Sequence, residues 1–175
     1  MATVNFNFFL KLARHYKRLN GLSVLQKSRY VLQALIGEVF RRRVLGLFGP
    51  RLVEITLTDR CQCRCVHCYN ETDIPVSLKN ELTTKEVFSV LEQAAALSCS
   101  EVCLTGGEPL LRADLLELIR HARKVGLVPK INTNGILLTP EMVNNLKKAG
   151  LAWCSVSIDS PEPERHDELR RYTGC

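Results

Sequence analysis

Residues 52–68 read LVEITLTDRCQCRCVHC, a short strand pattern followed by closely spaced cysteines. From Val53 to Thr58 apolar and polar side chains alternate, which is typical of a strand with one buried face. Four cysteines then fall within the eight residues from Cys61 to Cys68. The stretch therefore predicts a strand over 52–58 that ends in a cysteine-rich loop.

Downstream of this loop, short strand patterns alternate with longer helical ones. Such alternation is typical of βα units, whose strands pair in parallel. The sequence predicts further strands over 101–105, 128–133 and 153–158, and helices over 83–97, 112–125 and 139–149. We therefore expect an α/β fold built on a parallel sheet.

Capping residues mark the beginnings of the three predicted helices. Thr83 with Glu86, and Asp114 with Glu117, have the spacing of a capping box, in which each side chain bonds the other residue's backbone N–H. The pair Thr139-Pro140 supplies an N-cap followed by a proline at the first helical position.

A polar face runs through several of the predicted strands, opposite an apolar row that includes Val156 and Ile158 in the last strand. If helices covered both faces of the sheet, the strands would be apolar throughout. We therefore expect a curved sheet whose polar face lines a cavity. The members of this face are Glu54, Thr56 and Thr58 in the first strand, Lys130, Asn132 and Asn134 in the third, and Ser155, Ser157 and Asp159 in the fourth.

The chain's 175 residues, 46% hydrophobic and 24% charged, suit one soluble globular core. Charged residues interrupt each apolar segment before it reaches the ~18 residues of a membrane-spanning helix. The first ten residues, MATVNFNFFL, carry no basic leader, which argues against a secretory signal. We therefore expect a cytoplasmic protein, in which clustered cysteines bind metal rather than form disulfides.

Residues 1–50 predict a basic helical extension ahead of a core domain over 51–175. The first 51 residues contain ten Lys and Arg against the single acid Glu38, whereas the remainder contains fourteen against seventeen acids. Two amphipathic helices are expected near 8–19 and 24–40. They pack on the core domain or contact an anionic membrane surface or an acidic partner, because a basic amphipathic helix can do either. No nucleic acid is expected as a partner, since the basic residues are not interleaved with aromatic ones.

The cysteine-rich loop contains the spacing Cys-x3-Cys-x2-Cys at Cys61, Cys65 and Cys68. Three thiolates on one loop can each bind one iron of a [4Fe–4S] cluster and leave the fourth iron open to a small molecule. A structural zinc site is the alternative. Such a site needs four ligands, commonly in two separated pairs, and Cys63 and His67 could add to the set.

Three further motifs follow the cysteine motif in order. Gly106-Gly107-Glu108-Pro109 comes after the second strand, Thr133-Asn134-Gly135 ends the third, and Ser157-Ile158-Asp159 ends the fourth. Together with the cysteine motif they resemble the radical S-adenosylmethionine superfamily. The resemblance covers the chain from about residue 52 onward and implies a partial (β/α)6 barrel of the TIM type.

The resemblance also implies two cofactors, a [4Fe–4S] cluster and S-adenosylmethionine (AdoMet). Cys61, Cys65 and Cys68 would ligate three irons, and the amino and carboxylate groups of AdoMet would chelate the fourth. Matching positions imply further cofactor contacts, with His67 near the adenine and Glu108 at the AdoMet amino group. The full set is His67, Gly106, Gly107, Glu108, Pro109, Asn134, Ser157 and Asp159.

The implied reaction is radical chemistry. An external low-potential donor of the flavodoxin or ferredoxin type would reduce the cluster. Cleavage of AdoMet would then release methionine and a 5′-deoxyadenosyl radical that abstracts a substrate hydrogen atom. Because radical formation needs no side chain as an acid or base, no catalytic residue is predicted.

The turn Asp159-Ser160-Pro161 followed by His166-Asp167-Glu168 resembles the subgroup with SPASM-type C-terminal extensions. That subgroup acts on peptides, haem precursors or other cofactor precursors, so a peptide or small molecule is the expected substrate. The family's barrel needs six strands and the sequence predicts four, so we expect a chain truncated at its C-terminal side. A non-catalytic module that binds zinc or a cluster and an inactive fragment are the alternatives.

Overall fold

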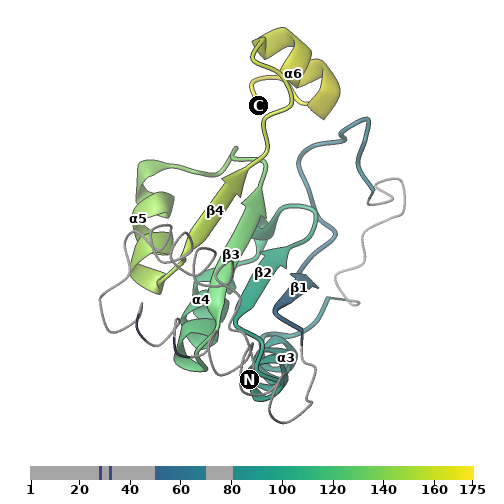
Figure 1. Ribbon diagram of the computed structural model, residues 1–175. Coiled ribbons are helices and arrows are strands. Elements are labelled where there is room, and N and C mark those ends of the chain that lie inside the picture. The colour runs from purple at the N-terminus through teal and green to yellow at the C-terminus, as the bar shows by residue number, and fades with distance from the viewer. Residues whose placement is uncertain (1–27, 29–31, 33–49, 70–80) are drawn as a thin grey trace, which may run out of the picture.

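The computed structural model describes Ser28, Leu32, residues 50–69 and residues 81–175. Within the two longer ranges, strands and helices alternate along the chain, as Figure 1 shows. The strands are β1 (Leu52–Thr56), β2 (Glu101–Thr105), β3 (Val128–Thr133) and β4 (Trp153–Val156). The α-helices are α3 (Thr84–Ala96), α4 (Leu115–Lys124), α5 (Pro140–Ala149) and α6 (Pro163–Arg170), and a short 3-10 helix, Pro109–Leu111, precedes α4.

The four strands form one parallel sheet in the order β1-β2-β3-β4. Ile55 pairs with Leu104, Leu104 with Ile131, and Ile131 with Cys154. The predicted α/β fold with a parallel sheet is therefore confirmed. Since the carboxyl ends of all four strands point the same way, the loops that follow them meet at one edge of the sheet.

Helices α3, α4 and α5 cover one face of the sheet (Figure 1). Apolar residues of the strands and helices meet there in one core cluster. Its fully buried members include Leu104 and Ile131 from the sheet and Leu91, Leu118 and Ile119 from the helices. Burying one such side chain contributes about 1.5–3 kcal/mol, so this layer is the main source of the free energy that holds the strands in place.

The opposite face of the sheet carries polar side chains, as predicted. Glu54, Thr105, Asn132 and Ser155 line one cavity. Three predicted members of this face, Thr56, Thr58 and Lys130, do not line the cavity. The Thr58 hydroxyl bonds to Glu81 and the Lys130 ammonium to Glu101.

The predicted apolar row of β4 is not separated from the cavity. Val156 is 46% exposed and Ile158 is 74% exposed, and both line the cavity alongside the polar residues. The reason is that β4 is the edge strand of the described sheet, and all four of its residues are exposed.

The predicted helix starts are confirmed for α3 and α5. Thr83 and Glu86 form a complete capping box, and Thr139 caps α5. Asp114 is likewise the N-cap residue of α4, but its side chain makes no capping hydrogen bond. Its carboxylate instead accepts two bonds from Arg112, at 2.8 and 2.7 Å, and one from the Thr84 hydroxyl at 2.7 Å. Helix α4 begins at Leu115, three residues later than the predicted start at residue 112.

Helix α6 is absent from the predicted helices. Its buried side chains, His166 and Arg170, are polar, so no apolar periodicity marks it. The predicted extension over 1–50 lies outside the described residues except for Ser28 and Leu32, which are helical, and Pro50. In the described part of the chain, no helix is long and apolar enough to cross a membrane.

The ion pair between Arg112 and Asp114 predicts a pH dependence of stability. Hydrogen bonds from Arg112 hold the pKa of the Asp114 carboxyl below its usual range. The resulting stabilisation is present above the unfolded-state pKa and is lost as the pH falls through the folded-state pKa. We expect Asp114→Asn to lower the free energy of unfolding at neutral pH and to flatten its fall below about pH 4.

Urea unfolding at a series of pH values measures both effects. Glu117→Gln is the matched control, because it removes an exposed carboxylate from the first turn of the same helix. Equal acid sensitivity in the wild type and in Asp114→Asn would contradict the role given to this pair.

Candidate metal and cofactor site

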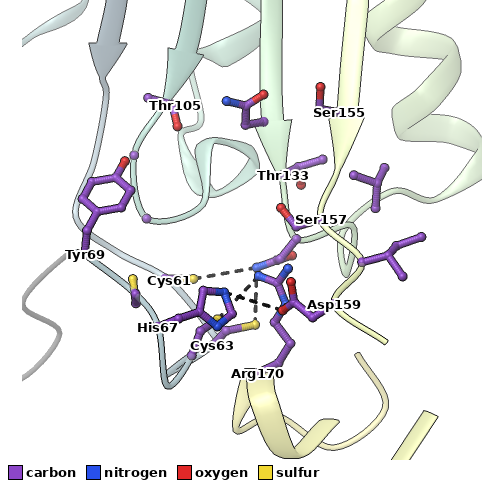
Figure 2. Close-up of a pocket in the computed structure, with 18 of the residues that line it drawn as sticks. Cys61, Cys63, His67, Tyr69, Thr105, Thr133, Ser155, Ser157, Asp159 and Arg170 are labelled. Carbon is purple, nitrogen blue, oxygen red and sulfur yellow. Dashed lines mark hydrogen bonds and ion pairs between the residues drawn. The ribbon is translucent and has the colours of Figure 1, made fainter. Parts of the chain in front are cut away.

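The loops that follow the four strands surround one cavity of about 590 Å³ at the carboxyl edge of the sheet. This volume is typical of small-molecule sites. Figure 2 shows the cavity with cysteine side chains beyond the ends of the strands. All four motifs of the sequence contribute to its lining, through Cys61, Cys65, His67, Cys68, Gly106, Gly107, Asn134, Ser157 and Asp159.

Two glycines bring the loop after β2 against the loop after β1. Gly107 N donates to the carbonyl oxygen of Thr58 at 2.6 Å, and Glu108 N donates to that of Arg60 at 2.7 Å. A Cβ atom at Gly106 would overlap the Thr58 backbone, and one at Gly107 would overlap the Arg60 carbonyl. Gly106 also has a φ of 146°, which L side chains rarely adopt. The glycines therefore fix the chain at the start of the cysteine-rich loop.

Glu108 is fully buried, and neither it nor Pro109 lines the cavity. Its carboxylate accepts hydrogen bonds from Thr133 Oγ1 at 2.7 Å, Asn134 N at 2.8 Å and Leu110 N at 3.0 Å. A buried carboxylate is tolerated only when such bonds satisfy it. Glu108 thus joins the loop after β2 to the loop after β3, whereas the family resemblance implies that it contacts AdoMet.

Asn134 extends this connection to the cysteine-rich loop. Its side-chain Nδ2 donates to Gln62 Oε1 at 3.1 Å, to Cys63 Sγ at 3.6 Å and to Cys61 Sγ at 3.8 Å. Its Oδ1 accepts from Ile136 N at 3.0 Å, which fixes the direction of the amide. Asn134 therefore holds the loop from the side of β3.

Charged side chains contact the segment through which the chain enters the cysteine-rich loop. Arg112 is 8% exposed and donates to the carbonyl oxygens of Leu57 and Leu82, both at 2.9 Å. It thereby ties the chain that enters the loop to the chain that enters α3. Glu81 pairs with Arg60 at 3.2 Å on the same side. None of these contacts is signalled by the sequence motifs, because each joins residues that lie far apart in the chain.

The thiols of Cys61, Cys65 and Cys68 all line the cavity, with Cys61 and Cys65 half-buried and Cys68 exposed. Thiolate sulfur is the ligand that iron–sulfur clusters use. Three protein ligands of a cubane bind three different irons, so their sulfurs need not converge on one point. Among the residues that the structure describes, no three Cys, His, Asp or Glu side chains are arranged to hold a single metal ion. Three thiols on one loop are a donor set that fits a [4Fe–4S] cluster.

Cys63 differs from the other cysteines of the loop. It is 2% exposed, and burial, followed by the nearby Cys175 thiol, raises the pKa of its own thiol. Cys63 also lines the cavity. It lies outside the Cys-x3-Cys-x2-Cys set, and its sulfur accepts a hydrogen bond from Asn134 Nδ2.

Asp159 and Arg170 complete the wall of the cavity on the side of β4. Asp159 Oδ2 lies 2.8 Å from Arg170 Nε and 3.6 Å from His67 Nε2, and Figure 2 shows the three side chains together. Arg170 Nη1 donates to Cys65 Sγ at 3.5 Å. Arg170 belongs to none of the sequence motifs, although it lies two residues after the His166–Glu168 run.

The contact at Gly107 gives a direct test of the loop geometry. We expect Gly107→Ala to push the Arg60 carbonyl away and to cost about 1–3 kcal/mol of stability, as overpacking typically does. Urea unfolding measures this loss. Gly174→Ala is the comparison, since no atom lies within 4 Å of its added methyl group and only the strain of its φ of 78° remains. A Gly107→Ala variant as stable as the wild type would contradict a close contact at Gly107.

Comparison with known proteins gives the family. A family model described as the radical SAM superfamily matches residues 55–174. The AdoMet-dependent heme synthase of Methanosarcina barkeri is 41% identical over 127 residues, which are 73% of this chain and 36% of that protein. The PqqA peptide cyclase of Bradyrhizobium diazoefficiens is 37% identical over 133 residues, 75% of this chain and 35% of that protein. The chain thus spans little more than a third of the length of these relatives.

A solved structure shows the same fold. The crystal structure of Streptococcus suis SuiB bound to the precursor peptide SuiA matches with a TM-score of 0.63 at 19% sequence identity. The match covers 85% of this chain and 32% of the SuiB chain. The chain therefore belongs to the radical SAM superfamily, whose cofactors are a [4Fe–4S] cluster and AdoMet.

Proposed function

We propose that this chain is the core of a radical SAM enzyme. Its reaction is the reductive cleavage of AdoMet to a 5′-deoxyadenosyl radical that abstracts a hydrogen atom from a substrate. One observation carries the proposal: the cysteine-rich loop, the glycine turn, Asn134 and the end of β4 come from four βα units and line a single cavity. A merely structural role would not require three thiols and several polar strand ends at one place.

Cys61, Cys65 and Cys68 are the proposed ligands of the cluster. When bound, the cluster and AdoMet supply the electron transfer and the radical chemistry, and the protein supplies orientation and exclusion of water. Asn134 and the backbone contact at Gly107 hold the loop that presents the thiols.

The proposed AdoMet-binding residues fall into two groups. His67, Gly106, Gly107, Asn134, Ser157 and Asp159 line the cavity and are proposed to contact the cofactor directly. Glu108 and Pro109 lie behind that surface. Their proposed part is to hold the loops after β2 and β3 in place, as the buried bonds of Glu108 support.

The proposed setting of the reaction is the maturation of a peptide, a haem precursor or another cofactor precursor. The names of the heme synthase and the peptide cyclase support it, as does the peptide bound to SuiB. Hydrogen-bonding groups on Glu54, Thr105, Asn132 and Ser155 offer such a substrate a polar wall.

The electron would come from an external low-potential donor of the flavodoxin or ferredoxin type. We further propose a division into a helical extension over 1–50 and a core over 51–175, in a cytoplasmic protein. In this division the extension packs on the core or contacts a membrane surface or an acidic partner.

Anaerobic reconstitution with ferrous iron and sulfide tests the cluster site. We expect about four irons per chain and the brown absorbance of a cluster. Three variants, Cys61→Ser, Cys65→Ser and Cys68→Ser, each lack one thiolate ligand. Each is therefore expected to lose most of its iron. Cys154→Ser is the matched control, because Cys154 is exposed and lies outside the cavity lining. Stoichiometric zinc without iron uptake, or full iron binding by Cys65→Ser, would refute the site.

The iron-loaded chain then tests the reaction. With dithionite and AdoMet, we expect 5′-deoxyadenosine and methionine in equal amounts, measured by liquid chromatography and mass spectrometry. Cys65→Ser is expected to give neither product, whereas Cys154→Ser retains both. An iron-loaded wild type that leaves AdoMet intact would contradict the proposed reaction.

A further inference from the structure

Helix α6 ends directly against the cysteine-rich loop. Arg64 N donates to the carbonyl oxygen of Arg170 at 3.1 Å, and Val66 N donates to that of Leu169 at 2.9 Å. These two bonds place the last turn of α6 beside Cys65, which lies between the two donors in the sequence. Residues far apart in the chain are thereby fixed next to each other, and the side chain of Arg170 is held at the thiol.

The Arg170 guanidinium lies between a thiol and a carboxylate. It is 7% exposed, donates from Nη1 to Cys65 Sγ at 3.5 Å and forms an ion pair through Nε with Asp159 Oδ2 at 2.8 Å. Asp159 is itself held in place, because its backbone N donates to His166 Nδ1 at 3.2 Å and its carboxylate faces His67. The guanidinium is thus fixed from two sides and cannot move freely away from the sulfur.

A buried cation at a cluster ligand has a defined electrostatic effect. The reduction potential of an iron–sulfur cluster depends on nearby charge, on hydrogen bonds to its sulfurs and on solvent exposure. Reduction adds one electron, so a positive charge stabilises the reduced state and a negative charge destabilises it. The effect is large where water is excluded, because the local dielectric is low. Arg170 meets these conditions, and Asp159 partly offsets its charge.

We propose that Arg170 is a positioning residue that raises the reduction potential of the cluster by its charge and its hydrogen bond to the Cys65 sulfur, and that Asp159 limits this effect. The inference rests on the proposed function, since it requires a cluster on Cys65. It assigns to α6 the role of setting how readily the cluster accepts one electron from a low-potential donor.

The test is a redox titration of the reconstituted chain, followed by the electron paramagnetic resonance signal of the reduced cluster. Dithionite is the reductant, and AdoMet is left out so that cofactor binding does not enter the result. Arg170→Gln removes the cation and leaves the Asp159 charge uncompensated, so its potential is expected to be more negative than that of the wild type. Asp159→Asn removes the opposing charge, so its potential is expected to be more positive.

Arg171→Gln is the matched control. It removes the same charge one residue further on, from an exposed side chain, and is expected to leave the potential close to the wild-type value. Arg170→Gln and Asp159→Asn are expected to shift the potential in opposite directions. Loosened packing would instead shift the potentials of these two variants in the same direction. Arg170→Lys retains the charge and is expected to lie between the wild type and Arg170→Gln.

Equal potentials for Arg170→Gln and Arg171→Gln, at equal iron content, would overturn the inference. If Arg170→Gln fails to retain iron, Asp159→Asn decides: a positive shift supports the inference and an unchanged or negative shift overturns it. Failure of the wild type to take up iron would instead overturn the proposed function, and this inference with it. The iron content of the wild type therefore separates the two failures.

Discussion

The close backbone contact between the Gly106–Gly107 turn and residues 58–60 is the constraint on which the site depends. Two short hydrogen bonds cross it, and neither glycine could carry a side chain without pushing the two segments apart. The contact sets where the cysteine-rich loop leaves the sheet. The loop is further fixed by the Asn134 side chain from β3, and by two backbone hydrogen bonds and the Arg170 side chain from α6.

Different forces hold the different parts of the molecule. Apolar burial between the sheet and helices α3 to α5 holds the strands, whereas buried charged groups hold the loops at the carboxyl edge. Those groups have partners: Glu108 accepts three hydrogen bonds, Arg112 donates to Asp114, and Arg170 forms an ion pair with Asp159. An unpaired buried charge would cost several kcal/mol, so removing one partner destabilises the loop that the other supports. The polar side chains on the cavity wall include Glu54 and Ser155.

Sequence periodicity predicts the elements that bury apolar surface, which are the four strands and helices α3, α4 and α5. The predicted first and fourth strands are each two residues longer than β1 and β4, because the alternating pattern continues past the last residue that pairs with the neighbouring strand. Periodicity misses α6, whose buried residues are His166 and Arg170. Motifs identify residues that gather at the cavity, but a motif gives no direction to a side chain. The buried orientation of Glu108 and the contact of Arg170 with Cys65 therefore become visible only in three dimensions.

The central claim is that three cysteines hold a cluster whose fourth iron is left for AdoMet. Mössbauer spectroscopy of the chain reconstituted with iron-57 tests it most directly, because the spectrum resolves individual iron sites. The account predicts that AdoMet changes the isomer shift of about one quarter of the iron and leaves the rest unchanged. A spectrum that AdoMet does not alter, or one in which all the irons change alike, would contradict it.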